Sequence, residues 1–111
     1  MAEQRYRAAA EAGEPIFLCD VVLVELVWVL GVTYRASRSE IVEALQSLLD
    51  DPIFVFQNRG TVQKGLDSYR QTNADFADHL IGFHAKTHGA RTVYTFDRKL
   101  SREEGFSLPS P

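Results

Sequence analysis

The stretch IFLCDVVLVELVWVLGVTY, residues 16–34, determines the fold class that we predict for this chain. Ile16-Phe17-Leu18 has the composition of a short buried strand, and Asp20 can cap a helix that follows it. The segment from Val21 to Tyr34 is apolar on nearly every side, so periodicity alone does not distinguish helix from strand. Its length favours a buried helix, whereas its β-branched residues favour a strand. We predict a helix, and therefore a strand–helix unit.

The rest of the chain continues this alternation. Ser37-Arg38-Ser39-Glu40 has the form of a capping box, and an apolar stripe at helical spacing follows it. We expect helices over Ala2 to Ala12, Ser37 to Asp50, Val62 to Tyr69 and Asn73 to His88, strands over Ile53 to Phe56, Arg91 to Phe96 and Phe106 to Leu108, and a turn or short helix over Leu100 to Glu104. This order predicts an α/β fold with a parallel sheet, built as a single domain over residues 1–111.

The composition is that of an ordinary globular domain. The 111 residues are 45% hydrophobic and 24% charged, with a net charge of −3. This acidic total gives no global attraction for nucleic acid, although a local basic rim matters more than the sum. Cys19 is the only cysteine, which excludes an intramolecular disulfide and favours a reducing cytoplasm. No signal peptide is recognisable and no apolar run is long enough to span a bilayer, so we expect a cytoplasmic protein without membrane contact.

Glu25 stands alone in an apolar run. Burying an unpaired carboxylate is costly, so this side chain should face a cation or a polar cavity. A partner arginine, or an exposed edge of the helix, explains it about as well.

Asp75 and Asp78 lie three residues apart and therefore on one face of a helix. Asp75 or Asn73 could simply cap this helix, and Asp78 could interact with the helix dipole in its first turn. For Asp78 this structural explanation is weaker, because Phe76 and Leu80 indicate that its side of the helix is partly buried.

Asp97 follows an apolar strand directly. In open α/β sheets the ligand crevice lies beyond the carboxyl ends of the strands, so an acid at this point is a functional candidate. Thr95 sends its hydroxyl to the same side of the strand, although a threonine there is also explained by β-propensity.

Basic residues and histidines complete the candidates. Arg98, Lys99 and Arg102 could hold phosphates beside the acids or simply solvate a loop. His79, His84 and His88 match no known zinc spacing, so we interpret them as surface histidines.

Three motifs occur in order along the chain: Val24-Glu25-Leu26-Val27-Trp28-Val29-Leu30, Asp75-Phe76-Ala77-Asp78-His79-Leu80-Ile81 and Thr95-Phe96-Asp97-Arg98-Lys99-Leu100. Together with Tyr34, Ser37-Arg38, Leu48-Leu49, Tyr69 and Gly105-Phe106, they resemble the PIN-domain family, in particular the VapC-type toxins of bacterial toxin–antitoxin pairs. The resemblance covers essentially the whole chain.

The resemblance implies a three-layer α/β fold, with a parallel sheet flanked by helices, and an endoribonuclease that uses Mg²⁺ or Mn²⁺. Glu25, Asp78 and Asp97 would be metal ligands, directly or through water. Asp75 would support them, Thr95 would orient a water molecule, and Arg98 and Lys99 would neutralise flanking phosphates of the RNA.

One feature of the family has no counterpart in the printed sequence. PIN domains begin with a central strand that ends in an Asp, within a Leu-Asp-Thr-Asn-like signature. We therefore expect a PIN-like domain that is truncated at its N-terminus, whose sheet falls into two halves without a shared neighbour. For residues 1–111 alone we expect weak or absent cleavage.

Three hypotheses of function follow. The first is a metal-dependent endoribonuclease toxin, neutralised by a cognate antitoxin protein. The second is a catalytically impaired remnant that only binds an antitoxin or another protein. The third is a structural α/β domain whose acids are caps and ion-pair partners. The apolar residues of the helix from Ile41 to Leu49, together with the family pattern, also suggest a homodimer.

Overall fold

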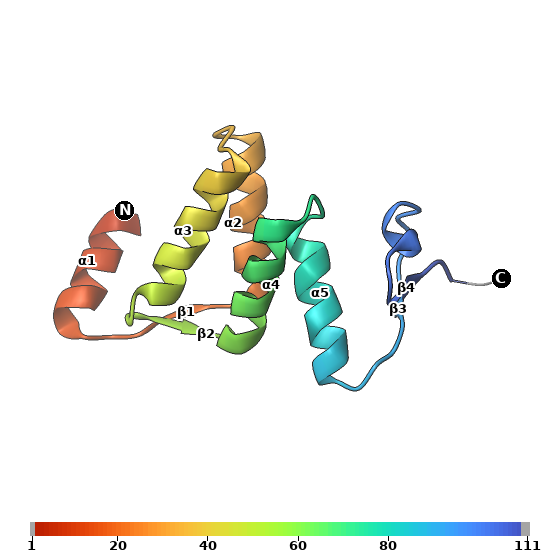
Figure 1. The fold of residues 1–111 in the computed structure, drawn as a ribbon. Helices are drawn as coiled ribbons and strands as arrows, with labels where there is room; N and C mark the ends of the chain where they lie inside the picture. The colour runs from red at the N-terminus through yellow and green to blue at the C-terminus, as the bar shows by residue number, and fades with distance from the viewer. Residues whose placement is uncertain (1, 110–111) are drawn as a thin grey trace.

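The computed structural model describes residues 2–109 and shows helices alternating with short strands (Figure 1). In chain order the elements are α1 (Ala2–Ala12), β1 (Ile16–Leu18), α2 (Asp20–Val32), α3 (Arg38–Asp50), β2 (Phe54–Phe56), α4 (Arg59–Gln71), α5 (Phe76–Thr87), β3 (Val93–Tyr94), the 3₁₀ turn η1 (Leu100–Arg102) and β4 (Phe106–Ser107). The predicted elements are all present, and most of them are shorter at one or both ends. In the described part of the chain, no helix has the length and apolar character needed to cross a membrane.

The segment after β1 is a helix, as predicted, but its start differs from the prediction. Cys19 occupies the N-cap position and makes no side-chain capping bond, and Asp20 is the first helical residue. The Asp20 carboxylate lies 2.5 Å from Nε2 of His84 in α5, while its backbone N–H donates to the Gln57 side chain. Asp20 therefore connects α2 with α5 through its side chain, and with Gln57, directly after β2, through its backbone N–H. It does not cap a helix.

The core lies between helices α2, α3, α4 and α5. Its fully buried members are Leu23, Leu45, Leu49, Val62, Leu66 and Phe76. The capping box predicted for α3 is present, with Ser37 and Glu40 exchanging both hydrogen bonds. The apolar stripe of this helix packs inward, as Ile41, Leu45 and Leu49 are each at most 5% exposed. These side chains are therefore unavailable for the dimer contact that the sequence suggested.

The strands are parallel, as predicted, and within residues 2–109 they pair as two separate two-stranded sheets. Ile16 of β1 is paired with Phe54 of β2, and Val93 of β3 with Phe106 of β4. No described strand lies between the two pairs, which agrees with the expectation of a sheet in two halves.

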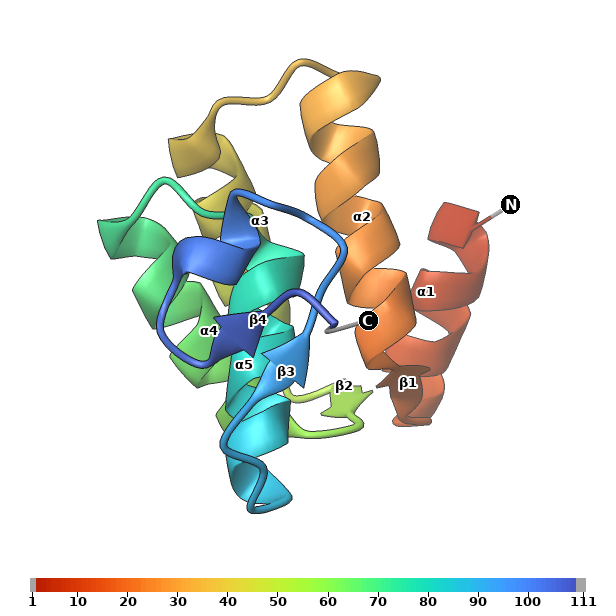
Figure 2. The ribbon, with the colours of Figure 1, turned by 90° about the vertical axis from the view of Figure 1, so that its right-hand side faces the viewer.

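The two ends of the chain make the molecule elongated. Figure 1 shows α1 at one end and β3–β4 at the other, and Figure 2 shows β3–β4 in front of α5. The radius of gyration is 15.7 Å, whereas roughly 13 Å is typical of a compact domain of this length. The acids of α5 and of the loop after β3 lie at the end of the molecule that carries β3 and β4.

Candidate active site

An acidic groove of about 100 Å³ lies where the start of α5 faces the loop after β3. Its lining includes Asp75 and Asp78 from α5 and its N-cap, Asp97 and Lys99 from the loop, and Glu103 after η1. The structure thus brings together three of the four predicted acids, which come from segments about twenty residues apart in the sequence.

Asp75 has the N-cap position of α5 but does not act as a cap through its side chain. No side-chain capping bond is formed, and the residue is exposed. Its backbone carbonyl instead accepts from the N–H groups of Asp78 and His79, at 3.1 and 3.2 Å. The capping explanation therefore does not account for the carboxylate, which is left on the groove wall.

The site raises the proton affinity of Asp78. Burial raises its pKa above the usual value, and the negative charges of Asp75 and Asp97 raise it further. The carboxylates of Asp75 and Asp97 are therefore close enough to repel that of Asp78, and a cation in the groove would relieve this repulsion.

Asp97 is held in place by its own loop. Its Oδ1 accepts from the backbone N–H of Lys99 at 2.9 Å and of Leu100 at 3.2 Å. The hydroxyl of Thr95 accepts from the Asp97 N–H at 3.1 Å. Oδ1 of Asp97 thus closes a turn of its own loop. Within residues 2–109, Oδ2 of Asp97 has no hydrogen-bond partner.

Three of the predicted residues, Glu25, Thr95 and Arg98, lie outside the groove lining. Glu25 is exposed on α2, and Arg98 is exposed beside Asp97. Thr95 is half-buried and contacts the site through the backbone of Asp97. Lys99 does line the groove, so one of the two predicted phosphate-binding cations is next to the acids.

Arg38 is a site-supporting residue that sequence reasoning missed. Its Nε donates to the carbonyl of Tyr69 at 3.0 Å, and its Nη2 donates to the carbonyl of Ala74 at 2.6 Å. The guanidinium also lies 3.7 Å from the centroid of the Tyr69 ring. Because Ala74 precedes Asp75, Arg38 holds the loop from which the first acid projects. The sequence contained two signals, its position at the start of a capped helix and its place in the Ser37-Arg38 pair of the family pattern, but neither indicated this role.

Two histidines are also not the surface residues that we expected. His84 pairs with Asp20, and its side chain is 27% exposed. His79 is half-buried beside Asp78 and shares a 2.7 Å hydrogen bond with the hydroxyl of Thr72. Burial lowers the pKa of His79, Arg38 lowers it further, and Glu103 opposes this shift. The neutral form of His79 is thus favoured near the groove.

The donor atoms of the groove suit a divalent cation, but the side chains that carry them lie too far apart to hold one ion together. Carboxylate oxygens are the ligands that Mg²⁺ and Mn²⁺ take, and the negative charges of Asp75 and Asp97 raise the pKa of Asp78. However, in the part of the chain that the structure describes, no three histidine, cysteine or acidic side chains are near enough to one another to hold one ion. The side chains of these acids would have to move closer together to hold a single metal ion.

Comparisons with known proteins found a family model and a relative that match this chain. A family model described as PIN domain matches residues 2–104. The chain is also 28% identical to the VapC ribonuclease of Aquifex aeolicus (strain VF5) over 109 residues, which amount to 98% of this chain and 80% of that protein. No solved structure matches the chain.

Proposed function

Since the chain belongs to the PIN-domain family, we propose that it is a metal-dependent endoribonuclease toxin, which hydrolyses phosphodiester bonds of RNA and is neutralised by a cognate antitoxin. The observation that carries this proposal is the acidic groove, where Asp75, Asp78 and Asp97 come together with Lys99. The similarity to a VapC ribonuclease supports RNA as the substrate.

In this proposal the three aspartates hold Mg²⁺ or Mn²⁺. A bound divalent cation would polarise the phosphodiester and lower the pKa of a water molecule for in-line attack. The Lys99 and Leu100 N–H groups orient the carboxylate of Asp97 so that Oδ2 is left for the ion. Lys99 and Arg98 neutralise phosphates on either side of the cleaved bond.

Thr95 and Glu25 have supporting roles in the proposed reaction. Thr95 holds the Asp97 backbone in the turn and, by the family pattern, orients a water molecule. Glu25 is exposed on α2 and does not line the groove, so we propose that it acts through water and not as a direct ligand.

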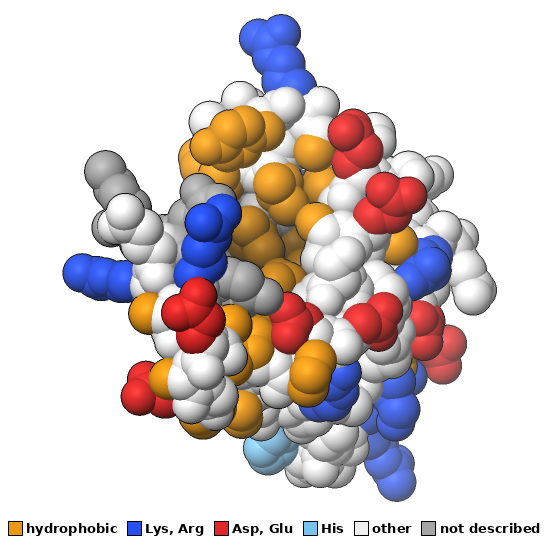
Figure 3. All heavy atoms as spheres, turned by 90° about the vertical axis from the view of Figure 1, so that its left-hand side faces the viewer, with side chains coloured by type: hydrophobic (Ala, Val, Ile, Leu, Met, Phe, Trp, Pro, Cys, Tyr) orange, Lys and Arg blue, Asp and Glu red, His pale blue; other side chains and the backbone are white. Residues whose placement is uncertain are grey.

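An exposed apolar surface on α2 supports a protein partner, either the antitoxin or a second copy of this chain. Trp28 is 62% exposed and Val32 is 59% exposed. Both line a largely apolar cavity of about 280 Å³ that also includes Asp75. A protein bound there would sit beside the acids and block access of RNA. Figure 3 shows a further gathering of apolar side chains in a hollow on the face that carries α1.

RNA cleavage by the Asp97→Asn variant tests the proposal. Asparagine keeps the oxygen that accepts from Lys99 and Leu100, so the fold should be unchanged by circular dichroism. Whatever Mg²⁺-dependent cleavage the wild type shows, which we expect to be weak for residues 1–111, should fall by more than the roughly 100-fold loss typical when a group behind a metal ligand is removed. The Glu43→Gln variant, which changes an exposed acid on α3, should cleave like the wild type.

Equal cleavage by Asp97→Asn would overturn the assignment of the site. Absence of cleavage by the wild-type chain, with antitoxin binding retained, would instead favour the second candidate function, that of a non-catalytic binding protein. The exposed apolar surface of α2 is the observation that favours this alternative.

A further inference from the structure

A second hollow, which we name the α5–β4 cavity, adjoins the acidic groove. It has a volume of about 160 Å³ and lies between α5 and the β3–β4 pair. Asp78 lines both the groove and this cavity, and a wider hollow of about 340 Å³ also borders both of them. A chain that passes through the acidic groove can therefore continue into the α5–β4 cavity.

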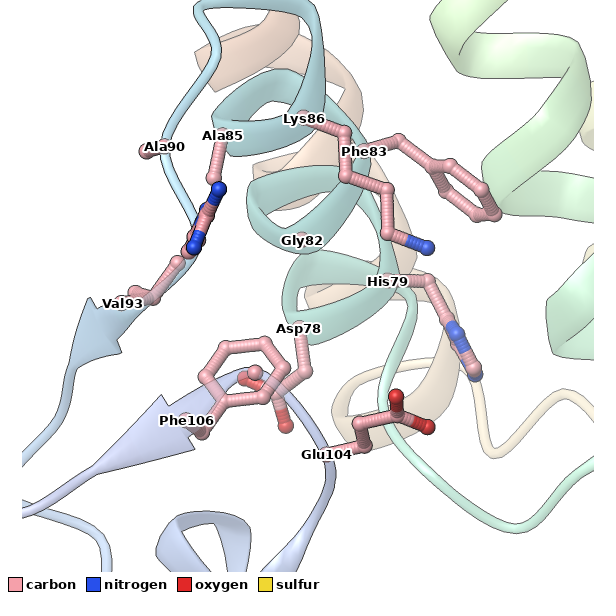
Figure 4. A pocket seen from close by; sticks show the side chains of 12 residues that line it. Asp78, His79, Gly82, Phe83, Ala85, Lys86, Ala90, Val93, Glu104 and Phe106 are labelled. Carbon is pink, nitrogen blue, oxygen red and sulfur yellow. The ribbon is translucent and has the colours of Figure 1, made fainter.

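The walls of this cavity suit a flat ring. Gly82 has no side chain, and a Cβ built on it would lie 3.4 Å from Cζ of Phe106. The aromatic ring is thus packed directly against the helix, and it remains half-exposed (Figure 4). Ala85 and Val93 complete the apolar walls. Aromatic rings in such slots stack with nucleobases, largely independently of sequence.

The charges at the cavity rim suit a nucleotide. Lys86 and Arg91 line the cavity and are exposed, and the Lys86 ammonium lies 5.3 Å from the centroid of the Phe83 ring. Glu104 is also exposed and lies nearer to Asp78 than Lys86 does (Figure 4). Its carboxylate can accept hydrogen bonds from the N–H groups of a base. An apolar peptide side chain would not interact with the positive charges of Lys86 and Arg91 or with the negative charge of Glu104.

We propose that the α5–β4 cavity binds the nucleotide next to the cleaved bond, with its base against Phe106 and its phosphate at Lys86 and Arg91. This subsite rests on the proposed function, since it presumes an RNA strand in the acidic groove. It extends that function by naming the residues that contact a base rather than the reacting phosphate.

Titration with mononucleotides tests the subsite without any cleavage. Amide resonances of Gly82 and Phe106 in the ¹⁵N-labelled chain should shift when nucleoside 5′-monophosphates are added. They should shift much less with ribose 5-phosphate or inorganic phosphate. Equal shifts with ribose 5-phosphate, or no shifts at all, would overturn the proposal.

Binding of a short single-stranded RNA, measured by fluorescence anisotropy in the presence of EDTA, separates the two parts of the subsite. Phe106→Leu keeps the apolar volume but not the ring, so the Kd should rise about 5- to 150-fold. Phe106→Tyr should bind like the wild type. The double variant Lys86→Ala/Arg91→Ala should flatten the salt dependence of log Kd by about 0.7 for each phosphate that is no longer neutralised.

The double variant Arg59→Ala/Lys64→Ala is the matched control, because it removes two exposed cations from α4, away from the cavity. If it weakens RNA binding as much as the cavity variants do, the subsite is wrong. Wild-type cleavage with unaffected Phe106→Leu binding would refute the subsite alone. Absence of both RNA binding and cleavage in the wild type would refute the proposed function, and the mononucleotide shifts would still report on the cavity.

Discussion

Arg38→Ala should destabilise the fold more than any other single change of an arginine in the described chain. The side chain is half-buried and makes two hydrogen bonds to carbonyls, of Tyr69 at 3.0 Å and of Ala74 at 2.6 Å. A hydrogen bond to a charged group contributes about 1.5–3 kcal/mol. The stacking on the Tyr69 ring, at 3.7 Å from its centroid, adds about 0.5–1 kcal/mol.

Water can reach the two carbonyls after the truncation, which reduces the total. We expect the free energy of unfolding to fall by about 2–4 kcal/mol, measured by urea denaturation and linear extrapolation. Arg38→Lys keeps the charge but loses the planar fork, and should lie between the wild type and the alanine variant. The same loosening should displace Asp75 and reduce RNA cleavage.

Arg59→Ala provides the comparison for Arg38. Arg59 is exposed and lies 5.2 Å from the centroid of the Phe56 ring. Its loss should lower the free energy of unfolding by no more than about 0.5–1 kcal/mol. If Arg38→Ala costs no more than Arg59→Ala, then Arg38 does not hold the loop before α5 and the reasoning is refuted.

Two further predictions concern buried charges. Because the pKa of Asp78 is raised in the folded state, its ionised form destabilises the fold above that pKa, and this penalty disappears below the usual value of 3.8. Asp78→Asn should therefore increase the free energy of unfolding at pH 7 and abolish cleavage. The increase in stability should vanish in denaturation series at low pH. A gain in stability that is independent of pH would show that the charge of Asp78 is not its cause. His84→Ala removes the partner of the Asp20 carboxylate, whose Oδ1 is already buried without a hydrogen bond, and should cost about 1–3 kcal/mol in the same assay. His88→Ala removes an exposed side chain whose Nδ1 lies 2.9 Å from the His84 carbonyl oxygen; it should cost less, about 0.5–1 kcal/mol, and an equal loss there would refute the role of the pair.

Local signals in the sequence were sufficient for most of the secondary structure. The capping box at Ser37 places the start of α3 correctly, and the segment after β1 is a helix despite its β-branched residues. Such features depend on interactions between residues a few positions apart, so a short stretch of sequence is enough to predict them. The ends of several elements were predicted less well, and the start of α2 shows why, since the side chain of Asp20 pairs with distant His84 instead of its own helix.

The candidate site was predictable in part. Asp78 and Asp97 were recognised from their motifs, and both line the acidic groove. The exposed position of Glu25 on α2 did not follow from its apolar neighbours, because a helix that is apolar on every side gives no indication of which face is covered.

The sequence by itself determined which elements form, which family pattern they follow and which acids are candidates for the chemistry. Only the tertiary structure decided that Arg38 joins α3 to the loop before Asp75, and that Phe106 packs on Gly82. The reason is physical: helix caps and turns depend on neighbours a few residues apart, whereas these contacts join segments 24 to 36 residues apart, whose meeting depends on how the whole core packs.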